Sequence, residues 1–156
     1  MSKAICIIGE SYCGKDFFIN RLKDFTSADV IHVGDEMRKL NVDGVCADPM
    51  ILADVIERNL TRYGDVIIDN AFKNVEQAEK VIHLLHVFDY EVSVILVVNN
   101  RKDFNIKSRK RADDDKIPEK WDLWKQEFPN LFSWLLRNQG EFTFRKVFNT
   151  DEGVLI

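Results

Sequence analysis

The chain has 156 residues, 46% of them hydrophobic and 31% charged, with a formal net charge of −4. This length suits one globular domain, and the net negative charge argues against a general nucleic-acid binder. The apolar runs are far shorter than the roughly 18 residues of a membrane span, and three cysteines without CxxC spacing predict neither a disulfide framework nor a zinc site. The first ten residues contain no signal-peptide cleavage region, so we expect a cytoplasmic protein.

Short apolar runs alternate with helical patterns along the chain. The predicted strands are residues 3–8, 29–33, 65–69, 91–98 and 132–137, the last ended by a turn at 138–140. The predicted helices are residues 15–25, 49–64 and 74–88. Two of them begin with capping signals, because Asp48 precedes a proline and Asn74 stands three residues before Gln77. The alternation indicates a parallel sheet with helices on both faces, an α/β fold in a single domain.

The first predicted strand is followed by GESYCGKDFF, residues 9–18. Gly9, Gly14 and Lys15 fit the phosphate-binding pattern G-x-x-x-x-G-K, in which glycines turn backbone N–H groups toward an anion and the lysine reaches the β/γ oxygens. The loop also opens a predicted helix, whose N-terminus attracts anions. The alternative is a glycine-rich turn without a ligand. We predict an ATP-binding loop formed by Gly9, Tyr12, Cys13, Gly14, Lys15, Asp16 and Phe17.

Asp16 occupies the position where the pattern has Ser or Thr. In the first helical turn a carboxylate gains roughly 0.3–1 kcal/mol from the helix dipole. Beside a phosphate its charge needs an offsetting cation, and oxygen ligands suit Mg²⁺. We therefore expect Asp16 to support a metal-bound nucleotide, directly or through water. The alternative is a residue that only begins the helix.

Three further segments resemble the motifs of one kinase family. HVGDEMRKL (32–40) is similar to T-G-D-x-x-R, and IIDNAFKNVEQAE (67–79) is similar to L-D-G-F-P-R-T-x-x-Q-A-E. RKRADDD (109–115) is similar to R-x-D-D. With the loop, these segments make the chain resemble the adenylate-kinase-like nucleoside monophosphate kinases. Its GKD sequence is similar to that of phage-type deoxynucleoside monophosphate kinases and phosphomevalonate kinases.

The resemblance implies a three-layer α/β/α sandwich of the P-loop NTPase type with a five-stranded parallel sheet. It implies transfer of phosphate from ATP, with Mg²⁺, to a nucleoside or deoxynucleoside monophosphate, and small-molecule nucleotides rather than nucleic acids as partners. The acceptor segment would span residues 32–64 and a short lid residues 101–116. The implied catalytic residues are Lys15, Arg109 and Arg111; the acceptor residues are Asp35, Arg38, Lys73 and Gln77; and Asp69 would position Mg²⁺ through water.

Several residues depart from the family pattern. Val33 replaces its Thr, residues 70–72 read Asn-Ala-Phe in place of G-F-P, and Lys73 replaces an Arg, which loses bidentate phosphate recognition. Two alternatives therefore stay open: a kinase with a non-nucleotide phosphorylated acceptor, and a catalytically silent nucleotide-binding protein. The basic residues of 101–111 also fit a solvated helix face. The aromatic residues at 121–134 are expected to belong to the core rather than to a base-stacking platform.

Overall fold

The computed structural model describes residues 1–10, 13–41, 48–61, 64–100, 117–150 and 153–155. The elements, in chain order, are β1 (Lys3–Gly9), α1 (Lys15–Lys23), β2 (Asp29–His32), α2 (Val33–Lys39), α3 (Pro49–Asn59), β3 (Val66–Asp69), α4 (Val75–Val87), β4 (Glu91–Asn100), α6 (Ile117–Arg137), β5 (Thr143–Thr150) and β6 (Gly153–Leu155). None of the described helices is long and apolar enough to cross a bilayer.

The strands form one sheet in the order β2-β3-β1-β4-β5-β6. The pairs from β2 to β5 are parallel, which confirms the predicted five-stranded parallel sheet. β6 adds an antiparallel edge strand that the sequence did not predict. Because parallel strands end at one edge, the residues that follow β1, β2 and β3 lie near one another there.

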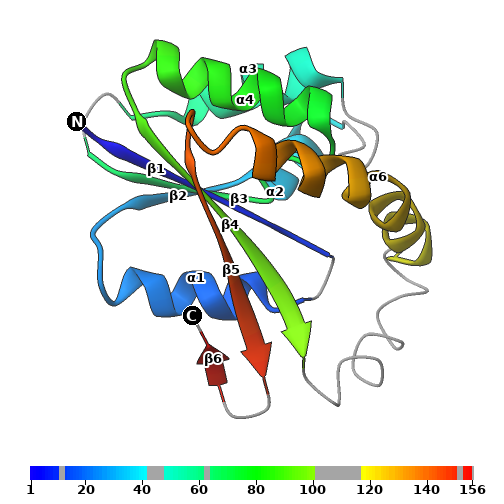
Figure 1. Ribbon diagram of the computed structural model, residues 1–156. Coiled ribbons are helices and arrows are strands. Elements are labelled where there is room, and N and C mark those ends of the chain that lie inside the picture. Colours follow the sequence, from blue (N-terminus) through cyan, green and yellow to red (C-terminus); the bar gives the residue numbers. More distant parts are fainter. Residues whose placement is uncertain (11–12, 42–47, 62–63, 101–116, 151–152, 156) are drawn as a thin grey trace.

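Helices cover both faces of the sheet (Figure 1). α1 lies on one face, while α2, α3, α4 and α6 lie on the other. Alternate residues of β1 belong to two separate clusters: Cys6 and Ile8 face the larger layer, and Ile7 packs with Phe18 and Ile19 of α1. Burial on both sides explains why the strands are almost continuously apolar.

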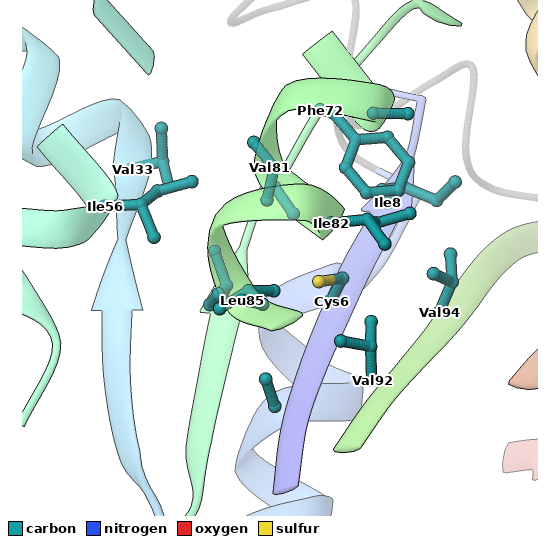
Figure 2. Packing of buried hydrophobic residues seen from close by; sticks show 14 of the residues in the cluster. Cys6, Ile8, Val33, Ile56, Phe72, Val81, Ile82, Leu85, Val92 and Val94 are labelled. Atoms are coloured by element: carbon teal, nitrogen blue, oxygen red, sulfur yellow. The ribbon is translucent and has the colours of Figure 1, made fainter. Parts of the chain in front are cut away.

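The larger cluster is centred on α4 and the strands beneath it (Figure 2). Val81, Ile82 and Leu85 of α4 pack toward Cys6 and Ile8 of β1 and toward Val92 and Val94 of β4. All of these side chains are buried. Phe72, from the connection between β3 and α4, is 1% exposed and completes the layer at the carboxyl-terminal edge of the sheet.

The prediction of the last parallel strand is wrong. Residues 132–137 lie within α6, and the strand that pairs with β4 is Thr143–Thr150. Leu131 and Leu135 of α6 are fully buried four residues apart, as expected for a helix face. Trp124 and Phe128 stack with ring centroids 5.0 Å apart, and both pack against the larger cluster, as does Trp134. The core role expected for these aromatic residues is therefore confirmed for Trp124, Phe128, Phe132 and Trp134, whereas the side chain of Trp121 lies outside the described part of the structure.

Both predicted helix caps are confirmed. The Asp48 carboxylate accepts a hydrogen bond from the backbone N–H of Met50 at 2.8 Å, and the Asn74 side chain accepts one from Gln77 N–H at 2.9 Å. α3 is shorter than predicted, because it ends at Asn59 and Leu60 is already extended. Gly64 is therefore not its C-cap, although it does adopt a positive φ of 95°.

Candidate nucleotide and metal site

The loop between β1 and α1 has the backbone that its glycines allow. Gly14 adopts a φ of 98°, a left-handed conformation that costs other residues about 1–2 kcal/mol. A Cβ on Gly9 would lie 2.8 Å from the carbonyl oxygen of Val97 and 2.7 Å from Cys13 Sγ. Both glycines are therefore needed, the first by close packing against β4 and the second by its backbone conformation.

Lys15 folds back over this loop. Its Nζ donates hydrogen bonds to the carbonyl oxygens of Gly9 at 3.1 Å and Glu10 at 2.9 Å. The same nitrogen lies 3.9 Å from Cys13 Sγ. The ammonium is thus held at the loop by carbonyl groups. Burial raises the pKa of the Cys13 thiol, which keeps that side chain neutral beside the lysine.

Asn149, near the end of β5, fastens the loop to the sheet. Its Nδ2 donates a 3.3 Å hydrogen bond to the carbonyl oxygen of Cys13, across 136 positions of sequence. The residue is 3% exposed, and its Oδ1 is buried without a hydrogen-bond partner among the described residues. A Cβ on Gly14 would lie 1.9 Å from Asn149 Nδ2. Gly14 is therefore required a second time, by the close approach of this side chain.

Asp16 and Asp69, the two predicted metal-site residues, lie close together, and a histidine joins them. Asp16 lies in the first turn of α1, His32 at the end of β2 and Asp69 at the end of β3. Potential metal-ligand atoms of the three side chains all lie within 4.8 Å of one another. Their carboxylate and imidazole groups fit a divalent cation. Asp69 Oδ1 is buried and has no hydrogen-bond partner among the described residues, which also fits a cation there.

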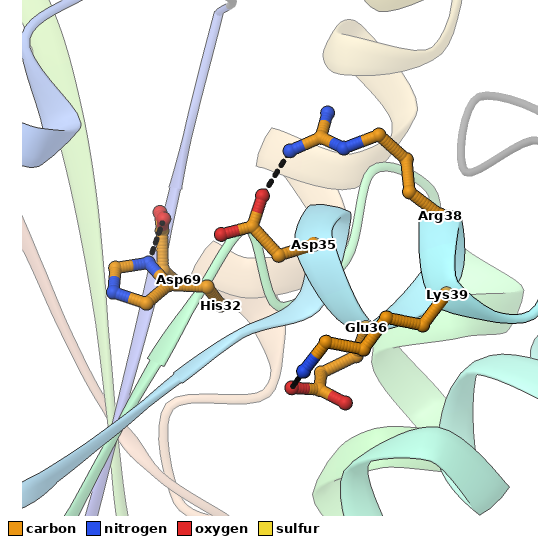
Figure 3. Close-up of polar contacts among 6 residues, drawn as sticks. All are labelled: His32, Asp35, Glu36, Arg38, Lys39 and Asp69. Atoms are coloured by element: carbon orange, nitrogen blue, oxygen red, sulfur yellow. Dashed lines mark hydrogen bonds and ion pairs between the residues drawn. The ribbon is translucent and has the colours of Figure 1, made fainter.

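The predicted acceptor residues Asp35 and Arg38 lie one turn apart on α2. They form an exposed ion pair with each other (Figure 3). Lys39 and Glu36 pair in the same way at 3.0 Å. The Arg38 side chain is 72% exposed, so its guanidinium is accessible to a ligand. Its predicted role in acceptor binding remains a prediction.

The segment that departs from the family pattern keeps a defined shape. Asn70 has a φ of 64°, which asparagine tolerates better than most residues, so it can stand where the pattern has glycine. Ala71 N–H donates to the carbonyl oxygen of Ile7 at 3.2 Å. Phe72 anchors the segment in the core, where the pattern has proline. The loss of the proline is thus offset by a buried aromatic side chain.

Gln77 is occupied in capping α4. Its Oε1 accepts a hydrogen bond from Lys73 N–H at 2.8 Å, and the residue is 2% exposed. This is the reciprocal bond of a capping box, displaced by one residue from the usual donor. This bond occupies Oε1 in a structural role and fixes the backbone that carries Lys73, while contact of Gln77 with a base remains a prediction.

Three predicted site residues, Tyr12, Arg109 and Arg111, lie outside the described residues, as does the predicted lid at 101–116. Phe17, predicted to bind ATP, lies on the outer side of α1, 40% exposed, with the guanidinium of Arg21 5.2 Å from its ring centroid. His32 and Asn149 were not among the predicted site residues. His32 comes beside Asp69 only through the register of β2 and β3.

Glu10, in the loop after β1, should make the stability of the protein depend on pH. Burial raises the pKa of its carboxyl group, and Lys125 of α6 and Lys15 partly offset this effect. The neutral carboxyl group is favoured in the folded protein, so its stabilising effect is fully present below the unfolded pKa of about 4.3. This effect is lost as the pH rises through the higher pKa of the folded protein. Glu10→Gln should therefore melt near the wild-type temperature at pH 4 and above it at pH 7. An equal shift in melting temperature at both pH values would contradict this account.

Gly34 offers a test of the predicted acceptor segment. It lies in the first turn of α2, and no described atom lies within 4 Å of a Cβ placed on it. Gly34→Ala should leave the free energy of unfolding unchanged or raise it by up to about 1 kcal/mol, because alanine favours helix. If the acceptor approaches this backbone, its KM should rise by at least about tenfold, or 1.4 kcal/mol. Unchanged acceptor kinetics in the folded variant would remove the segment from the site.

No protein-family model matches the sequence, and no curated protein matches it significantly. Solved structures do match. The structure of the Mycobacterium tuberculosis APS kinase CysC, in complex with AMPPNP and APS, is 17% identical with a TM-score of 0.56, over 72% of each chain. A structure from the PezAT chromosomal toxin–antitoxin system of Streptococcus pneumoniae is 16% identical with a TM-score of 0.62, over 100% of this chain and 70% of the other. At these identities the likeness concerns the fold, and with the strand order and the loop it shows that the chain has a P-loop NTPase-like fold.

Proposed function

We propose that the protein transfers the γ-phosphoryl group of ATP to a nucleoside or deoxynucleoside monophosphate. One observation carries the proposal: the glycine loop and its lysine follow β1, and Asp16, the next residue, lies close to Asp69 at the end of β3. Phosphoryl transfer depends on positioning and on neutralising negative charge, and this arrangement brings a cation and two carboxylates to one edge of the sheet. The fold-level likeness to a kinase bound to AMPPNP and APS supports a nucleotide as one ligand.

Each site residue would have a separate role in this reaction. Backbone N–H groups from Gly9 to Lys15 would cradle the ATP phosphates, and the Lys15 ammonium would leave the loop carbonyls for the β/γ oxygens. Asp16 and Asp69 would hold Mg²⁺, which neutralises phosphate charge when bound. Arg38 and Lys73 would hold the acceptor phosphate. Arg109 and Arg111 would contribute charge from the lid.

A phosphorylated small molecule without a base is the second candidate acceptor. The commitment of Gln77 to capping α4 favours it, because the family resemblance assigns contact with the base to this residue. The remaining acceptor groups, Arg38 and Lys73, recognise phosphate by charge and would serve either substrate.

A coupled ADP-release assay tests these proposals. The full chain with ATP and Mg²⁺ is given a panel of nucleoside monophosphates, deoxynucleoside monophosphates and small phosphorylated alcohols. Turnover with one nucleotide supports the first proposal, and turnover with a non-nucleotide alone supports the second. ATP binding without turnover on any acceptor would contradict both and indicate a silent nucleotide-binding protein.

A further inference from the structure

The geometry points to a mixed nitrogen and oxygen metal site, in which His32 ligates a divalent cation together with Asp16 and Asp69. Such a site would bind Co²⁺ and Zn²⁺ more tightly than Mg²⁺. The inference rests on the proposed function for the role of the ion in the reaction, whereas the site itself can be tested without nucleotide.

The sheet order places the three side chains together. β2 and β3 are neighbouring parallel strands whose register pairs His32 with Asp69 at their carboxyl ends. β3 lies beside β1, and the loop that leaves β1 leads into the helix that carries Asp16. Ligands from three separate elements thus meet at one point, where potential ligand atoms lie within 4.8 Å of one another.

The distance between His32 and Asp69 fits two ligands of one ion. His32 Nδ1 lies 3.1 Å from Asp69 Oδ2. Figure 3 marks this contact with a dashed line. Two ligands at right angles around a cation, each about 2.1 Å from it, are about 3.0 Å apart. Metal binding through Nδ1 therefore needs little movement of either side chain. Alternatively, Nδ1–H donates to Asp69 and leaves Nε2 as the ligand, the arrangement common in histidine metal sites.

The second oxygen of Asp69 supports a cation independently of the cluster. Asp69 Oδ1 is buried and accepts no hydrogen bond from the described residues, although the side chain as a whole is 14% exposed. Buried carboxylate oxygens normally have a donor or a cation as partner. His32, at 43% exposed, leaves the cluster open to an incoming ion.

The nitrogen ligand decides which metals the site prefers. Mg²⁺ prefers oxygen ligands in a strict octahedron and gives up its water reluctantly. Imidazole suits later divalent metals, and affinity for Co²⁺ and Zn²⁺ exceeds that for earlier ions at mixed sites. An all-oxygen pair of Asp16 and Asp69 would show a weaker preference. The presence of His32 therefore predicts stronger selectivity than the two carboxylates alone would give.

A titration of the nucleotide-free full chain with Co²⁺ tests the inference. We expect binding of one ion per chain with a visible absorption band, and competition by Zn²⁺ at lower concentration than by Mg²⁺. His32→Ala should weaken Co²⁺ binding by about tenfold or more and change the band, with a smaller effect on Mg²⁺. His83→Ala, an exposed histidine on α4, is the matched control and should bind as wild type. Asp69→Asn should also weaken Co²⁺ binding.

Circular dichroism and thermal melting would test whether each variant is folded. His32→Asn, which retains a polar group beside Asp69, serves as a second variant. Equal Co²⁺ affinity and spectrum in wild type, His32→Ala and His32→Asn would overturn the inference, as would the absence of saturable Co²⁺ binding to wild type. Turnover with Mg·ATP but no Co²⁺ site would refute only the metal inference. A Co²⁺ site without turnover on any acceptor would refute only the proposed function.

Discussion

Lys15→Ala is expected to lower kcat for phosphoryl transfer by at least about a hundredfold, the usual effect of removing a group that stabilises charge in a transition state. The lysine is the cation that the loop itself holds in place, through two carbonyl oxygens at 3.1 and 2.9 Å. Because the charge it stabilises grows as the γ-phosphoryl group leaves, kcat should fall more than the affinity for ATP. Steady-state kinetics with the best acceptor of the panel, together with ATP titration, would measure the two effects separately.

Lys23→Ala provides the matched control, since this lysine is exposed in the last turn of the same helix. It should retain wild-type kinetics. Thermal melting of both variants separates a catalytic effect from a folding effect. A folded Lys15→Ala protein with near-normal turnover would remove the loop from the proposed reaction.

Gly14→Ala should combine two penalties at one position. The left-handed backbone costs about 1–2 kcal/mol for alanine, and the new Cβ would lie 1.9 Å from Asn149 Nδ2, too close for any real contact. We expect a loss of more than about 2 kcal/mol in the free energy of unfolding and weakened ATP binding, because the loop must shift away from β5. Denaturant unfolding and ATP titration would measure both.

Two further variants divide this penalty into its parts. Gly64→Ala tests the backbone cost alone, because Gly64 has a φ of 95° and no described atom within 4 Å of an added Cβ. It should lose about 1–2 kcal/mol. Adding Asn149→Ala to Gly14→Ala should restore the steric part but not the backbone part, so the two changes should be non-additive. Additive losses would show that Asn149 does not press on the loop.

The first four parallel strands could be predicted from sequence because each is a short apolar run buried on both faces. The fifth could not. In residues 143–150, positions 143–146 are exposed or half-buried and only Val147 and Asn149 are buried, so polar residues interrupt the strand and it lacks the apolar run of the other parallel strands. Residues 132–137 contain the apolar stretch Trp134–Leu136, but they belong to a long helix whose apolar face covers the core. Short apolar runs do not distinguish a buried strand from a buried helix segment.

The site also contains residues that could be recognised from the sequence and residues that could not. The roles of Asp16 and Asp69 remain predictions. The loop itself could be recognised from the sequence, because its glycines and lysine follow a predicted strand in a known pattern. His32 and Asn149 could not, since their roles arise from strand order and register rather than from local spacing. Asn149 was also hidden by the misplaced fifth strand. Pairings across 37 and 136 positions become visible only when the sheet is assembled.

The hydrogen bond from Asn149 to the loop has a consequence for how the protein matures. The loop is made before β5, yet one of its hydrogen bonds comes from Asn149 of that strand, 136 positions later. A growing chain would carry the complete loop sequence without this support until β5 is made. ATP affinity would then report whether β5 has docked, and bound ATP should in return slow hydrogen exchange in β5.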